Sequence, residues 1–111
     1  GVAAARAERD RARAELRLTE LESRRDVARV TEARAIALQR AGRDRTLLAA
    51  ANRVATMALA AYREGASPLS DVLQAQANAR GTLGQYITDV GAANAAAAAL
   101  RLLTASAPRI P

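Results

Sequence analysis

The chain has 111 residues, enough for one domain, and half of them are hydrophobic. Alanine dominates, Phe and Trp are absent, and Tyr62 and Tyr86 are the only aromatic residues. Because the sequence has no Cys and no His, it excludes thiol and imidazole catalysis, disulfides and the common zinc ligands. The formal net charge of +6 comes from arginine alone, since no Lys is present.

The alanine-rich composition favours an elongated assembly component. Alanine buries little area, and each buried methylene-sized group is worth only about 0.8 kcal/mol, so a compact monomeric core would be weak. Small residues suit long helices packed side by side, as in coiled coils. No apolar run approaches the roughly 20 residues that span a bilayer, and the start has no signal-peptide hydrophobic region. The sequence begins within a helical pattern, so we expect a fragment of a longer protein.

Residues 2–64 are predicted to form one long helix. They contain no proline and a single glycine, Gly42, among strong helix formers. At 1.5 Å per residue this helix would be about 90 Å long, which favours a coiled coil or a helical array over an ordinary globular helix. Glu, Asp and Arg alternate along its first two thirds and pair at helical spacing, as in Glu20 with Arg24. Such pairs mainly solubilise an exposed face.

An apolar seam follows each predicted helix in steps of mostly three and four residues. In the first helix it comprises Leu16, Val27, Val30, Ala37, Ala41, Leu48, Ala51, Ala55, Ala58 and Tyr62, with interruptions at Arg34 and Asp44. In the second it comprises Leu69, Val72, Gln76, Ala79, Leu83, Tyr86, Val90, Ala93, Ala97 and Leu100. These steps favour left-handed supercoiling. Gly81, Gly84 and Gly91 lie off the seam. Each glycine lowers the stability of an exposed helix by up to about 1 kcal/mol, so either the helix is weak there or another helix packs closely against that side.

Turn residues occur between the two helical patterns. Gly65 can adopt the left-handed conformation that ends a helix. Ser67 is placed to cap the second helix, and Pro68 falls at its first position. Asp71 follows in the first turn, where the helix dipole favours a carboxylate. The sequence therefore predicts the tip of a helical hairpin.

The predicted fold class is all-α, a long antiparallel helical hairpin or coiled coil that forms a single domain over residues 1–111. The first helix covers about residues 2–64 and the second about residues 68–105. Residues 106–111 are predicted to be an extended tail, because Pro108 disfavours a helical residue before it. The arms are unequal, so other helices must cover the upper part of the first, from a missing part of the chain or from other subunits.

Catalytic and nucleic-acid sites are not indicated. Helix-start chemistry explains the grouping of Ser67, Ser70 and Asp71, and neither a second carboxylate for acid–base work nor a phosphate-binding glycine loop is present. The 14 arginines of residues 1–64 are interleaved with nine acids, without aromatic side chains to stack bases. The alanine-rich stripe also lacks aromatic anchors for a membrane surface. We predict a protein that is not an enzyme, uses no cofactor or metal, and binds no nucleic acid.

The stretch Tyr62–Gln76 resembles the Y-x-x-G-x-x-x-L-x-D-V-L-x-A-Q signature of TolC-like outer-membrane efflux proteins. The long helix before the tip and the shorter helix after it resemble one of the two repeats of that family in relative length and composition. In the family the closing segment usually ends in glycine, where this chain has Ala105 or Ser106. The residues around the tip are most similar to the second repeat and to the heavy-metal efflux branch.

This resemblance implies a periplasmic wall segment of a homotrimeric outer-membrane duct that exports small compounds or metal ions. In the family, a periplasmic adaptor links the duct to an inner-membrane pump, and membrane contact would come from parts missing here. The implied docking tip comprises Tyr62, Glu64, Gly65, Ala66, Ser67, Pro68, Leu69, Asp71 and Val72. Glu64, Gly65 and Ala66 would form the docking loop. Tyr62, Leu69 and Val72 would pack the turn, and Asp71 would cap the second helix or line the tip.

Three alternatives remain open. The chain could be the coiled-coil hairpin of a periplasmic adaptor, whose tips typically carry an Arg-x-x-x-Leu pattern with Ser before the return helix. Ser67 fits that pattern loosely, whereas Tyr62 and the run Asp71-Val72-Leu73 do not. The chain could also be a generic helical-hairpin interaction module, and the tip residues could build a turn without docking. An upstream signal peptide, four short strands and a second similar hairpin would favour the efflux interpretation.

Overall fold

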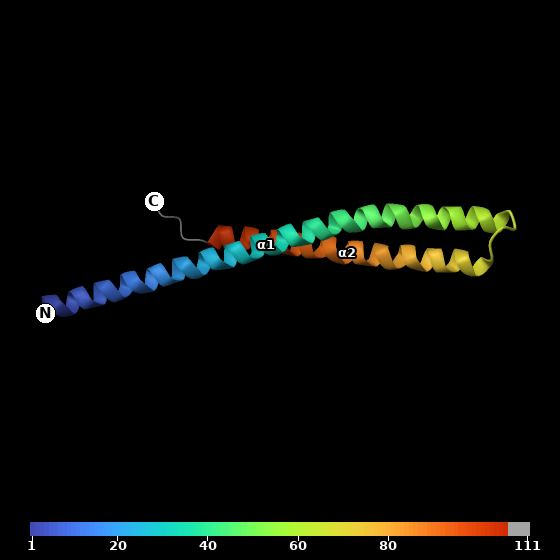
Figure 1. Cartoon of the computed structure of the whole chain (residues 1–111). Coiled ribbons are helices and arrows are strands. Elements are labelled where there is room, and N and C mark those ends of the chain that lie inside the picture. The colour runs from blue at the N-terminus through green and yellow to red at the C-terminus, as the bar shows by residue number, and fades with distance from the viewer. Residues whose placement is uncertain (107–111) are drawn as a thin grey trace.

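The computed structural model describes residues 1–106, which form two long antiparallel helices joined by a short turn (Figure 1). Helix α1 spans Val2–Arg63 and helix α2 spans Leu69–Ser106. The molecule is 95 Å long and 22 Å by 14 Å across, so it is a rod rather than a globule. The predicted all-α hairpin is confirmed, and each helix end lies within one residue of its expected position where the two can be compared.

The predicted start of the C-terminal tail is wrong by one residue. Ser106 was expected in the tail, but it is the last residue of α2. The steric effect of Pro108 falls on the residue directly before it, so Ser106 is free to remain helical. The rest of the predicted tail, residues 107–111, lies outside the described residues.

The two arms are unequal, as the sequence predicted. Helix α1 has 62 residues and α2 has 38, so α1 is 24 residues longer, or about 36 Å at 1.5 Å per residue. In Figure 1 the blue N-terminal part of α1 projects well past the end of α2. Every residue of the segment 1–19 is exposed. Leu16, Leu18 and Leu21 on this overhang are each more than half exposed, so the hairpin leaves part of α1 without cover.

The interface between the helices is built from small side chains. Its buried apolar members are Ala37, Ala41, Val72, Ala75 and Ala93, four alanines among five residues. Within residues 1–106 no large side chain is fully buried. Because a buried alanine removes little apolar area from water, the interface contributes little stability for its length.

The apolar seams are mostly as predicted, with four exceptions among their larger members. Leu16 lies on the uncovered overhang and is 55% exposed. Tyr62 and Leu69 flank the turn, where no further helical turn covers them, and they are 42% and 49% exposed. Leu83 is 43% exposed because its neighbour Thr82 takes the more sheltered position.

The charged side chains on the surface form hydrogen bonds and ion pairs only with near neighbours along the described part of the chain. Within residues 1–106 the only ion pair joins Arg29 to Asp26, with 2.6 Å between Nη2 and Oδ1. The expected Glu20–Arg24 pair does not form in that part of the chain. Both partners of the observed pair are exposed, so its contribution to stability is small. Neither α1 nor α2, over its described length, is apolar enough along a sufficient stretch to cross a membrane.

Candidate functional site

Helix α1 ends in the left-handed turn that the sequence predicted at Gly65. Gly65 has a φ of +77°, in the left-handed region, and follows the C-cap residue Glu64. The backbone N–H of Gly65 donates to the carbonyl of Tyr62 at 3.0 Å, and that of Ala66 donates to the carbonyl of Ala61 at 2.8 Å. These two bonds define a Schellman motif, which satisfies carbonyls that the helix end would otherwise leave unpaired.

The start of α2 differs from the prediction in its details. The first helical residue is Leu69, so Pro68 precedes the helix instead of occupying its first position. The Pro68 carbonyl accepts a hydrogen bond from the Asp71 N–H at 3.1 Å. Within the described residues, the Ser67 hydroxyl makes no capping bond to the first turn. The carboxylate of Asp71 does lie in that turn, where the positive end of the helix dipole favours it.

The structure gathers all nine predicted tip residues at one end of the rod. Glu64, Gly65, Ala66, Pro68 and Asp71 are exposed, and Ser67 is half-buried. Of the three residues expected to pack the turn, only Val72 is buried, at 3% exposure. Tyr62 and Leu69 retain 42% and 49% exposure. The tip therefore presents a short loop with apolar side chains exposed on both of its flanks.

The tip combines exposed acidic residues with a short loop. Glu64 and Asp71 are its only carboxylates, and both are exposed to solvent. Over residues 1–106 no group of three or more His, Cys, Asp or Glu side chains is placed to hold a metal ion. The Glu64–Ala66 loop exposes one acid, one glycine and one alanine.

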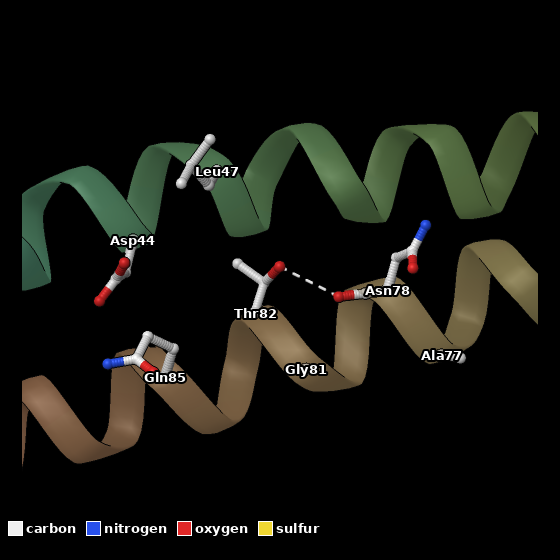
Figure 2. Close-up of a pocket in the computed structure, with 7 residues that line it drawn as sticks. All are labelled: Asp44, Leu47, Ala77, Asn78, Gly81, Thr82 and Gln85. Atoms are coloured by element: carbon white, nitrogen blue, oxygen red, sulfur yellow. Dashed lines mark hydrogen bonds between the residues drawn. The ribbon is translucent and has the colours of Figure 1, made fainter.

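Sequence reasoning missed a second polar feature, an aspartate pair at the middle of the interface. Asp44 on α1 and Asp89 on α2 are 8% and 7% exposed, so both are buried. Gln85 lies between them: its side-chain amide donates to Oδ2 of Asp89, and Asp44 is directed toward it from α1 (Figure 2). Asp44 was interpreted as an interruption of the apolar seam. It is instead a member of the seam, three residues after Ala41 and four before Leu48.

The two aspartates have divergent pKa values. The hydrogen bond between the carboxyl groups, together with burial and the Asp89 charge, raises the pKa of Asp44. The same hydrogen bond and a second one from Gln85 lower the pKa of Asp89. Arg40 and Arg43 attract both carboxylates. Opposite shifts in two neighbouring acids are the behaviour expected when they hold one proton between them.

A shallow groove of about 450 Å³ lies beside this pair. Its lining residues are Asp44, Leu47, Ala77, Asn78, Gly81, Thr82 and Gln85. Figure 2 shows Asp44 directed from α1 toward Gln85 on α2, while Thr82 and Asn78 point from α2 toward α1. The Thr82 hydroxyl donates to the Asn78 carbonyl at 3.0 Å, so it is satisfied within its own helix.

Comparison with known proteins gives no relative: no family model, curated protein or solved structure matches this chain.

Proposed function

We propose that this hairpin is a wall segment of a trimeric outer-membrane export duct, with the Glu64–Ala66 loop as its docking tip for a periplasmic adaptor. The duct would pass small compounds or metal ions from an inner-membrane pump to the cell exterior. The observation that carries the proposal is that the hairpin leaves helical surface suited to further packing on both of its arms. A structure with such surfaces fits a wall of many helices better than it fits a self-sufficient domain.

The outer face of α2 is the first of these surfaces. It lies opposite the interface with α1, and its apolar and glycine members, which have Arg80 among them, are all exposed: Leu73, Ala77, Gly84, Ile87, Gly91, Ala95 and Ala98. A Cβ added at Gly84 or Gly91 would meet no atom within 4 Å, so the hairpin's own packing does not require these glycines. Each glycine costs an exposed helix up to about 1 kcal/mol. Close approach of another helix on that side would explain their presence.

The overhang of α1 is the second surface. Segment 1–19 is exposed throughout, and Leu16, Leu18 and Leu21 lie on or next to it. An isolated helix of this kind has no tertiary packing to stabilise it, and helices in proteins draw most of their stability from such packing. A neighbouring hairpin would provide it. In a wall of staggered helices, long arms and short arms alternate, which matches the inequality of α1 and α2.

The resemblance at the tip supplies the identity of the docking partner. The Schellman motif at Gly65 holds Glu64 and Ala66 in a fixed, exposed turn. Preorganised loops bind with a smaller entropic penalty than flexible ones. The exposed flanks of Tyr62 and Leu69 add apolar area that contact with an adaptor would bury.

Site-directed crosslinking in the full-length protein tests the proposal. Residues 1–111 contain no cysteine, so an introduced thiol is the only one in this part of the protein. With a thiol-reactive crosslinker, Ala66→Cys at the tip should link to a periplasmic adaptor. The matched control Ala95→Cys, on the outer face of α2, should instead link to other helices of the duct protein itself.

The two products separate the possible outcomes. A tip crosslink to an outer-membrane channel would favour the adaptor-hairpin alternative and overturn the duct assignment. Identical products from Ala66→Cys and Ala95→Cys would show that the tip has no docking role. Gly65→Val should reduce the tip crosslink, because a β-branched residue strains the left-handed turn. An unchanged yield would refute the docking loop.

A further inference from the structure

The aspartate pair places two acidic side chains in an otherwise apolar helix interface. Asp44 occupies the seam between Ala41 and Leu48, and Asp89 is buried on α2 directly before the seam residue Val90. Both are more than nine-tenths buried. Two carboxylates that face each other away from water repel, and each loses hydration. The pair therefore needs a partner that removes one negative charge.

The hydrogen-bond partners of the two acids indicate what that partner is. The Gln85 side-chain amide donates to Oδ2 of Asp89 at 3.2 Å. Oδ2 of Asp44 is buried and meets no hydrogen-bond donor among the described residues. A buried carboxylate oxygen without a donor is costly, whereas a carboxyl group that carries a proton becomes a donor itself. One proton between the two acids satisfies both.

We propose that Asp44 and Asp89 form a proton-binding latch at the middle of the hairpin. The latch holds α1 and α2 together there when the two acids share one proton, and it lets them separate more easily when that proton is lost. The ligand is a single proton, held between one carboxyl and one carboxylate. The groups that face the pair are Arg40 and Arg43 on α1 and Gln85 on α2. The two arginines attract both acids, and the amide favours the ionised form of Asp89. Asp44 is therefore the acid that keeps the proton.

The direction of the pH dependence follows from this assignment. The pKa of Asp44 is raised above the ordinary value of 3.8, so its contribution to stability is lost as pH rises from 3.8 through that raised pKa. The pKa of Asp89 is lowered, so its contribution is lost as pH falls from 3.8 through the lowered pKa. The latch is therefore strongest near pH 3.8 and weakens on both sides.

Thermal and denaturant unfolding at a series of pH values tests the proposal in the 111-residue chain. Above pH 3.8, unfolding releases the shared proton, so the unfolding equilibrium constant should rise by up to about tenfold per pH unit until Asp44 ionises. Asp44→Asn supplies a permanent amide donor of nearly the same shape. It should remove this slope and make the chain more stable than the wild type at alkaline pH.

The exposed Asp10 provides the matched control. Asp10→Asn changes the net charge equally, but it should leave the pH slope of the wild type in place. If Asp44→Asn and Asp10→Asn have the same slope, no proton is shared and the proposal fails. An Asp44→Asn variant that is less stable at every pH but keeps the wild-type slope would also overturn it.

A distance measurement separates loosening of the latch from a general loss of stability. Thr46 and Thr88 are exposed, lie next to the pair on opposite helices, and can carry spin labels after substitution by cysteine. In the wild-type background the distribution of label distances should be narrow near pH 3.8 and broaden above the raised pKa of Asp44. In the Asp44→Asn background it should stay narrow. A distribution that does not change with pH in the wild type would refute the latch.

Discussion

The conformation of Gly65 leads to a prediction with a definite sign. Its φ of +77° lies in the region that costs a residue with a Cβ roughly 1–2 kcal/mol. A Cβ at this position would meet no atom within 4 Å, so Gly65→Ala introduces no clash. The substitution also restricts the unfolded chain, which returns about 0.4–1 kcal/mol. The net effect should be a destabilisation of up to about 1.6 kcal/mol, caused by backbone strain.

Gly81 provides the matched control for this substitution. It lies inside α2 with helical geometry, and a Cβ there would also meet no atom within 4 Å. Gly81→Ala should therefore stabilise the chain by about 0.5–1 kcal/mol through helix propensity. The same chemical change is thus expected to have opposite effects at the two positions.

Thermal unfolding followed by circular dichroism measures this difference. A change of 1 kcal/mol shifts Tm by about 4 °C in a chain of this size. Gly65→Ala should melt below the wild type and Gly81→Ala above it, with a gap of about 2–10 °C between the variants. If Gly65→Ala melts at or above the wild type, the left-handed turn does not form in solution. The Schellman motif would then be an incorrect description of the tip.

Two further substitutions test the interface and the outer face of α2. Val72→Ala should lower the free energy of unfolding by about 1–2 kcal/mol, because it removes apolar groups at a side chain that is 3% exposed. Val54→Ala, at 56% exposure, should change it by less than about 0.5 kcal/mol, and equal effects in urea unfolding would contradict the assigned interface. Gly84→Ala and Gly91→Ala should each stabilise the monomer by about 0.5–1 kcal/mol but weaken self-association in sedimentation experiments. Unweakened association would show that the outer face is not a packing surface.

Features set by local chemistry were predictable from the sequence. Gly65 could be placed in the left-handed region because only the glycine between two helical patterns adopts it without strain. The hydrogen bond expected from Ser67 could not be foreseen to fail. The Pro68 carbonyl accepts a bond from the Asp71 N–H, which is not one of the N–H groups that a cap at Ser67 would bind. Whether a side chain reaches the first turn of a helix depends on loop geometry that no residue pattern specifies.

Features that depend on how the helices rotate against each other were harder to predict. Thr82 and Leu83 are adjacent, and only the rotation of α2 about its axis decides which one faces α1. The aspartate pair was missed for a different reason. Asp44 stands at seam spacing, three residues after Ala41 and four before Leu48, but a charged residue there indicates an interruption. Asp89 directly precedes the seam residue Val90, so spacing alone does not place it in the interface.

The alanine-rich interface has a consequence for how the two helices are aligned along their length. A seam of near-identical small side chains offers almost equal packing if one helix slides by a heptad, since few large knobs fill particular holes. Two features oppose such sliding. The short turn at Gly65 fixes where α2 begins, and the pair of Asp44 and Asp89 would leave two buried acids apart if the register changed. The alignment of this rod therefore depends on its turn and one polar contact, while the alanines between them hold the helices close in whatever register those two points set.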